Sequence, residues 1–89
     1  MEYQYPMDVE WTTEEKLAVI AFFQAVEKAY EKGISAKELL NAYQHFKKVV
    51  PAKSEEKTHC AAFEKGSGYS AYRTVKTARE AEETALIRM

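Results

Sequence analysis

Apolar residues recur at helical spacing along most of this 89-residue chain, and no stretch longer than a few residues alternates as a β-strand would. The pattern predicts an all-α fold. We expect a compact bundle of about four helices that forms a single domain over residues 1–89, because a chain of this length has room for one core.

The two ends of the chain are expected to differ from the helices. Residues 1–11 are predicted to form an irregular arm, since Pro6 removes a backbone donor and favours an extended residue before it. The arm carries Tyr3, Tyr5 and Trp11, which we expect to cover the helices. Residues 84–89 either fray or dock through Leu86 and Ile87.

The first helix is predicted from its cap. Thr12 and Glu15 have the spacing of a capping box, and Gly33 is the expected stop after a helix that runs to about Lys32. Leu17 and Ile20 lie outside the apolar stripe of this helix. The stripe itself is expected to consist of Val19, Phe22, Phe23, Val26 and Tyr30.

The second helix has the clearest local signal in the chain. Ser35 and Glu38 have the spacing of a capping box, while Ile34 and Leu39 occupy the two positions of a hydrophobic staple. Pro51 ends the helix. Because the link between the first two helices is so short, we expect an antiparallel hairpin. Its apolar face is expected to comprise Leu39, Tyr43, Phe46 and Val50.

Two further helices are predicted in the second half of the chain. A short third helix starts at Ser54 and ends at Gly66, and a fourth starts near Ser67 or Ser70 and runs to about Glu83. The core stripe of the fourth helix is predicted to be Ala71, Tyr72, Val75 and Ala78. A second stripe, directed outward, is predicted to be Tyr69, Arg73 and Lys76.

Composition argues against a disulfide-bonded protein and against a membrane-spanning one. The net charge is −1, apolar residues make up 46%, and the single cysteine excludes an internal disulfide. The longest apolar run, Leu17 to Phe23, is far shorter than the roughly 20 residues that a membrane span requires. The first residues lack the order of a signal peptide, so we expect a cytoplasmic protein.

The sequence also resembles a known family over nearly its whole length. The segments YQYPMDVEWTTEE, FFQAVEKAYEKGI and SGYSAYR resemble the YktA-like family of small uncharacterised proteins of Gram-positive bacteria. The resemblance implies a compact all-α domain of bacterial origin with a cytosolic location. It implies no activity, substrate or catalytic residue.

Neither metal binding nor catalysis has a recognisable motif. The strong nitrogen and sulfur ligands are His45, His59 and Cys60, and the last two point about 100° apart on a helix, so we expect no metal. The chain lacks a G-x-S-x-G elbow, a phosphate loop and an H-E-x-x-H pair. We therefore expect no cofactor and no enzymatic activity.

Nucleic-acid binding is the alternative function. Ala62, Gly66 and Tyr72 have the spacing of a helix-turn-helix unit, whose second helix would present Arg73 and Lys76 to DNA. Against this, the isoelectric point is about 6.1, whereas nucleic-acid-binding domains are usually basic.

The favoured hypothesis is a non-enzymatic protein that acts through protein–protein interaction, in a regulatory role or as a homodimer. The candidate contacts with an unknown protein partner are Tyr69, Arg73, Lys76 and Arg79. The candidate subunit contacts are Leu17, Ile20 and Leu40, because they are apolar residues beside the predicted core stripes.

Overall fold

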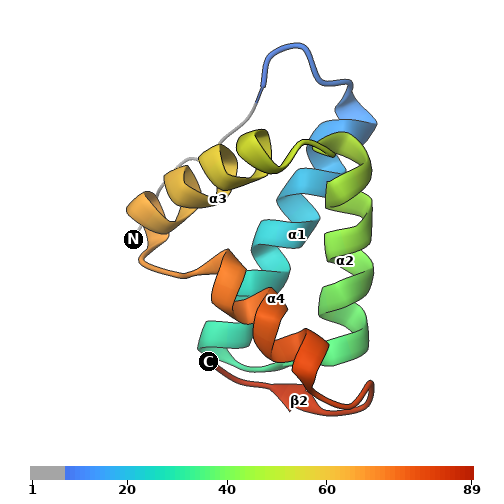
Figure 1. Cartoon of the computed structure of the whole chain (residues 1–89), viewed down its shortest axis with the longest axis vertical. Helices are drawn as coiled ribbons and strands as arrows, with labels where there is room; N and C mark the ends of the chain where they lie inside the picture. The colour runs from blue at the N-terminus through green and yellow to red at the C-terminus, as the bar shows by residue number, and fades with distance from the viewer. Residues whose placement is uncertain (1–7) are drawn as a thin grey trace.

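The computed structural model describes residues 8–89, and its helical architecture confirms the predicted all-α bundle (Figure 1). The elements in chain order are α1 (Thr13–Glu31), β1 (Ile34–Ser35), α2 (Ala36–Val49), α3 (Lys53–Ser67), α4 (Ala71–Glu80) and β2 (Leu86–Ile87). The prediction for the aromatic arm falls partly on Tyr3 and Tyr5, which lie outside the described residues. Trp11 is half-buried, and its ring lies 5.1 Å from that of His59 on α3.

Helices α1 and α2 form the predicted antiparallel hairpin and lie side by side (Figure 1). The complete capping box begins α1, since Thr12 accepts from the Glu15 N–H and Glu15 accepts from the Thr12 N–H. Between the helices, Gly33 has a φ of +105°, a backbone conformation that disfavours side chains. Local sequence therefore specifies both the start and the turn of this hairpin.

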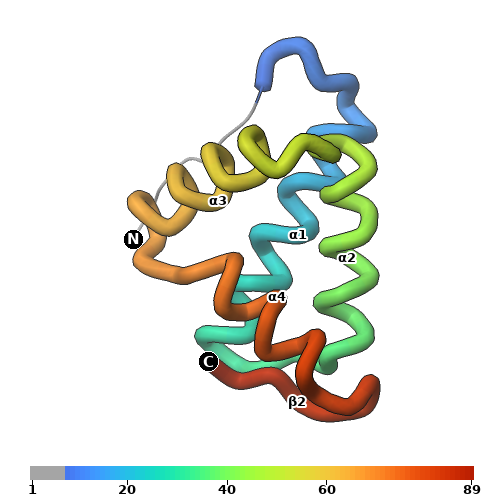
Figure 2. Tube along the Cα trace, viewed as in Figure 1, coloured from blue at the N-terminus to red at the C-terminus, as the bar shows by residue number. Residues whose placement is uncertain are grey.

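The C-terminal tail docks on the α1–α2 turn, which is one of the two outcomes that the sequence left open (Figure 2). Antiparallel pairing places Ile34 opposite Ile87 in a sheet of two short strands. The amides of Ala36 and Lys37, at the start of α2, donate to carbonyls of residues 85 and 83. The tail thus satisfies backbone donors that the first turn of a helix leaves without intrahelical partners.

The largest side chains of the core are aromatic rings from the first three helices. Phe22 stacks on Phe46 with ring centroids 4.7 Å apart, and Phe23 stacks on Phe63 at 4.4 Å. All four rings are fully buried. These stacks join α1 to α2 and α1 to α3, and Phe63 is the fully buried residue that α3 contributes to the core.

Helix α3 runs across the α1–α2 hairpin near one end, and α4 packs nearer the other end (Figure 1). The prediction of a short third helix that ends at Gly66 is wrong, since α3 has 15 residues and reaches Ser67. Gly68, with a φ of +81°, ends it. Helix α4 begins at the predicted cap Ser70 but stops at Glu80, earlier than expected.

Helix α4 also has a different buried face from the predicted one. Tyr72 was expected in the core, yet it is 73% exposed, while Thr74 is fully buried. The inward stripe is Ala71, Val75 and Ala78, and Tyr72 lies about 100° away from Ala71 around the helix. The Thr74 hydroxyl donates to the Ser70 carbonyl at 2.7 Å, which lets this polar side chain be buried.

Candidate functional site

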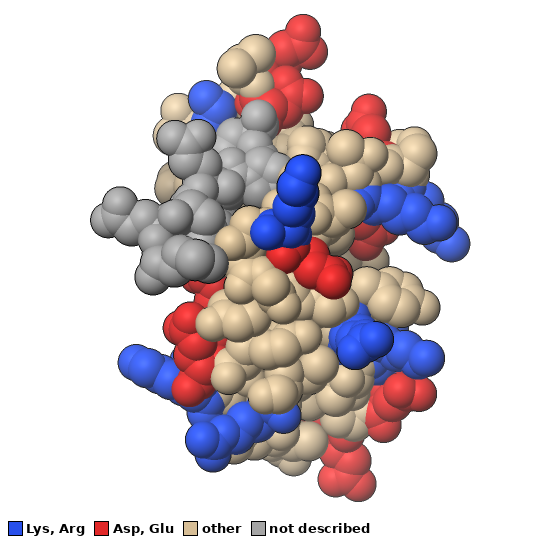
Figure 3. Space-filling view, turned by 90° about the vertical axis from the view of Figure 1, so that its left-hand side faces the viewer, with Lys and Arg blue, Asp and Glu red and all other residues tan. Residues whose placement is uncertain are grey.

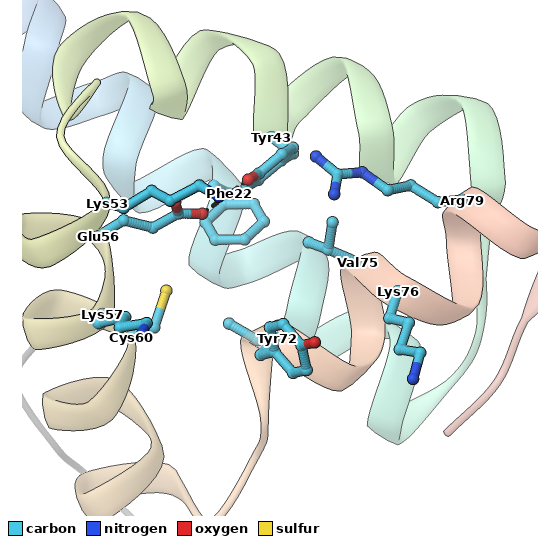
Figure 4. A pocket seen from close by; sticks show the side chains of 11 residues that line it. Phe22, Tyr43, Lys53, Glu56, Lys57, Cys60, Tyr72, Val75, Lys76 and Arg79 are labelled. Atoms are coloured by element: carbon cyan, nitrogen blue, oxygen red, sulfur yellow. Dashed lines mark hydrogen bonds between the residues drawn. The ribbon is translucent and has the colours of Figure 1, made fainter.

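A cavity of about 300 Å³ lies between α2, α3 and α4, with one side formed by α1 (Figure 4). Its apolar lining includes Phe22 from α1 and Val75 from α4, and the exposed Tyr72 ring stands at its edge. The full set of lining residues is Phe22, Tyr43, Lys53, Glu56, Lys57, Cys60, Ala71, Tyr72, Val75, Lys76 and Arg79.

The cavity exists because α3 contributes little bulk to the core. Phe63 is the one fully buried residue that we observe along α3, and it lies near the C-terminal end of the helix. Farther toward the N-terminus, the positions that face α4 are Glu56 and Cys60, while α4 offers the small residue Ala71. Small and polar side chains on facing helices leave the space unfilled.

One wall of the cavity carries a linked set of polar groups. The Tyr43 hydroxyl donates to Glu56 Oε2 at 2.7 Å, and Lys47 Nζ donates to Glu56 Oε1 at 2.9 Å. The Arg79 guanidinium lies 5.2 Å from the centroid of the Tyr43 ring, within cation–π range. Both carboxylate oxygens of Glu56 are thus occupied by donors from α2.

These contacts shift the pKa values of Tyr43 and Glu56. Burial, together with the hydrogen bond to Glu56, raises the pKa of Tyr43 to about 12. Burial alone would raise the pKa of Glu56, but the hydrogen bonds from Lys47 and Tyr43 bring that pKa below its ordinary value. Glu56 therefore remains an anion, and Tyr43 a neutral donor, throughout the physiological pH range.

We expect Glu56→Gln to lower the free energy of unfolding by about 1–2 kcal/mol at pH 7, because it removes a charge-assisted pair that is only partly exposed. The Lys47 and Glu56 side chains are 28% and 19% exposed. Because the folded pKa of Glu56 is depressed, its contribution is complete above about pH 4.5 and is lost as the pH falls through the folded pKa. Urea unfolding from pH 7 to pH 3 measures this difference.

The exposed neighbour Glu55 provides the matched control for that experiment. Glu55→Gln should change the stability at pH 7 by less than about 0.5 kcal/mol. The wild type and Glu56→Gln should converge in acid. A gap between them that stays constant down to pH 3 would contradict the assignment of the stabilisation to the Glu56 carboxylate.

Cys60 directs its sulfur toward the cavity (Figure 4). Burial raises the pKa of this thiol to about 12, with a further increase from the Glu56 charge. Since the thiolate is the nucleophilic form, the environment of Cys60 disfavours nucleophilic chemistry. Its position on the cavity wall, by contrast, makes it a useful point for altering the volume of the cavity.

The structure separates the four residues that were predicted to contact a partner. Lys76 and Arg79 line the cavity, whereas Arg73 is exposed on α4 outside it. Tyr69 precedes α4 and does not belong to an outward stripe. Its ring stacks on Tyr30 at 4.5 Å, and its hydroxyl donates to Glu31 at 2.9 Å, so Tyr69 helps to fix the α3–α4 connection to α1.

The helix-turn-helix hypothesis does not fit the observed packing. Gly66 lies within α3, and the left-handed residue at the turn is Gly68. Ala62 and Tyr72 are exposed, although that motif would require them to pack between its helices. On the face that Figure 3 shows, acidic and basic side chains are interspersed around an uncharged area.

The candidate subunit contacts also lie in different environments. Leu17 is 59% exposed on α1, and Ile20 is half-buried. Leu40 is half-buried and packs against the core. Of the three, Leu17 therefore has the most apolar surface available for a contact.

Sequence reasoning missed most of the cavity. Tyr43 was assigned to the core, Glu56 to the solvated start of the third helix, and Lys53 and Lys57 were assigned no role. The available signal was the spacing of Lys53 and Lys57, which places them on the same side of α3. Within residues 8–89, no group of three or more histidine, cysteine or acidic side chains could hold a metal ion. No helix in the same range is long and apolar enough to cross a membrane.

Comparison with known proteins gives a consistent family relationship. A model of an uncharacterised protein family, UPF0223, matches residues 2–87. A UPF0223 protein of Bacillus pumilus (strain SAFR-032) is 79% identical over 89 residues, which cover 100% of both chains. The UPF0223 protein YktA of Bacillus subtilis (strain 168) is 60% identical over 86 residues, covering 97% of this chain and 98% of the relative. The predicted resemblance to the YktA-like family is confirmed.

Proposed function

The chain belongs to the UPF0223 family, an uncharacterised protein family, and we propose that it is a non-enzymatic protein that binds another protein through the cavity between α2, α3 and α4. The observation that carries the proposal is an apolar cavity of about 300 Å³ with an exposed tyrosine, Tyr72, at its edge. Aromatic residues that line or border a pocket are typical anchors of protein interfaces.

The chemistry of the cavity supports binding over catalysis. A general acid or base works best when its pKa lies near the operating pH. The pKa values of Tyr43 and Cys60 are raised to about 12, and that of Glu56 is lowered. These shifts move all three groups away from neutrality, and the Tyr43–Glu56 hydrogen bond holds two of them in a fixed arrangement.

The test is to block the cavity without unfolding the protein. Cys60→Phe places a ring in the cavity, whereas Ala61→Phe adds the same ring at the adjacent, exposed position of α3. The wild type and both variants are immobilised and exposed to a lysate of Bacillus cells, with and without nuclease treatment. Retained proteins are identified by mass spectrometry and then purified for direct binding measurements.

We expect a protein that the wild type and Ala61→Phe retain and that Cys60→Phe does not retain. The purified partner should bind the wild type directly and bind Cys60→Phe at least about tenfold more weakly. The proposal is overturned if the wild type retains no protein in excess over Cys60→Phe, or if the difference in retention disappears after nuclease treatment.

A further inference from the structure

Basic side chains border the cavity from both of the helices that flank it. Lys53 and Lys57 are four residues apart on α3, while Lys76 and Arg79 are three residues apart on α4. Each spacing places two side chains on the same side of a helix. The α3 and α4 sides of the cavity therefore both carry positive charge.

The three lysines of this set are not engaged in close ion pairs with described residues. Among residues 8–89, no ion pair within 4.0 Å involves Lys53, Lys57 or Lys76. The one carboxylate among the described residues that line the cavity belongs to Glu56, whose oxygens already accept from Tyr43 and Lys47. The exposed lysines are therefore available to attract negative charge from outside.

The inside of the cavity, in contrast to its basic border, favours an apolar group. The apolar surface that it exposes comes from the Tyr72 ring and from Cys60, over a floor of buried residues that includes Phe22 and Val75. The nearby hydroxyl of Tyr43 is already committed to Glu56. A charged group that passed beyond the basic residues at the border would lose its hydration against apolar atoms, whereas an apolar side chain would gain from burial. The volume, about 300 Å³, is at the low end for ligand pockets and suits one large side chain better than a cofactor.

We infer that the cavity binds an acidic segment of a partner protein, with one large apolar side chain inserted between α3 and α4 and acidic residues on both sides of it. This inference rests on the proposed function and specifies the chemistry of the partner. The apolar side chain provides most of the affinity, and the carboxylates speed association and fix orientation by approaching Lys53 and Lys57 on one side and Lys76 on the other.

The charge distribution favours an acidic protein segment over a nucleic acid. Glu55 and Glu56 lie between Lys53 and Lys57 on α3, and Glu80 directly follows Arg79 on α4, so each basic pair has an acidic neighbour in the sequence. A phosphate backbone that passed across these helices would meet both signs of charge. A short peptide can place its carboxylates opposite single lysines and avoid the neighbouring acids.

An unbiased selection tests the inference. A library of random 12-residue peptides is displayed on phage and panned in parallel on the wild-type protein and on Cys60→Phe. We expect the enriched peptides to carry net negative charge, with one Phe, Trp, Leu or Met flanked by Asp or Glu. Fluorescence anisotropy then gives the affinity of an enriched peptide, of the same peptide with serine at the apolar position, and of single-stranded oligo-dT.

A pair of matched variants assigns the charge contribution. The double variant Lys53→Glu/Lys57→Glu should weaken binding of the enriched peptide at least about tenfold. The control Lys48→Glu/Lys65→Glu makes the same charge change outside the cavity and should alter binding by less than about threefold. The serine-substituted peptide should bind at least about tenfold more weakly than its parent.

Four results would overturn the inference. In the selection, these are enriched peptides that are neutral or basic, and no enrichment over Cys60→Phe. In the binding and assembly measurements, they are oligo-dT that binds more tightly than the peptide, and a wild-type dimer whose formation Cys60→Phe abolishes. Neutral or basic peptides that still require an open cavity would leave the proposed function standing and exclude only an acidic partner. Loss of cavity-dependent retention from the lysate would instead remove the proposed function itself.

Discussion

Phe63→Ala is expected to lower the free energy of unfolding by about 3–5 kcal/mol, since it empties a fully buried aromatic site. Phe63 is the buried anchor of α3, and its ring stacks on Phe23 at a centroid distance of 4.4 Å. A domain of this size has a total stability of roughly 4–13 kcal/mol, so the loss is a large part of the whole. Thermal denaturation followed by circular dichroism should show a midpoint lowered by about 15–30 °C.

The same substitution should act first on α3. Because α3 has few other buried side chains, its amide protons should lose protection from hydrogen exchange more than those of the α1–α2 hairpin. Lys65→Ala, at an exposed position of the same helix, is the control and should shift the midpoint by only a few degrees. A midpoint within about 5 °C of the wild type for Phe63→Ala would show that α3 is held by other contacts.

The parts of the fold that depend on local sequence could be predicted. The Thr12–Glu15 capping box and the conformation of Gly33 involve residues a few positions apart, so a linear pattern contains them. The staple residues Ile34 and Leu39 are both buried, as their spacing predicted. These signals were sufficient for the α1–α2 hairpin because neighbouring helices with a short connection have few ways to pack.

The parts that depend on distant contacts could not be predicted. The β1–β2 pairing joins residues about fifty positions apart through strands too short to show alternation. The exposure of Tyr72 reverses the usual preference of an aromatic residue, and the burial of Thr74 depends on its hydroxyl bond to Ser70. Residue type alone would assign both of these positions to the wrong side of α4.

The candidate site combines both kinds of information. Helical spacing groups Lys53 with Lys57, and it also groups Lys76 with Arg79. The distance between these pairs depends on how α3 crosses the bundle, to which the Phe23–Phe63 stack and the hydrogen bonds of Glu56 to α2 both contribute. Without that crossing, the four basic residues would be ordinary solvated side chains, and no cavity would lie between them.

Cys60→Phe is expected to stabilise the fold and to abolish binding at the same time. Filling a pre-existing cavity with apolar atoms should raise the free energy of unfolding by about 0.5–2 kcal/mol, because about 300 Å³ is more than the added ring requires. The same ring occupies the position of the inserted partner side chain, so affinity for an enriched peptide should fall about 100-fold, equivalent to about 2.7 kcal/mol. Urea denaturation and fluorescence anisotropy measure the two effects on the same sample.

Opposite changes in stability and binding distinguish a binding cavity from a packing defect. A cavity that is only a defect would yield the stability gain without any loss of binding when it is filled. Ala61→Phe, with the same ring on the exposed side of α3, should leave both quantities nearly unchanged. If Cys60→Phe is more stable yet binds the peptide as tightly as the wild type, the peptide contacts another surface, and the space between α3 and α4 is simply an unfilled part of the core.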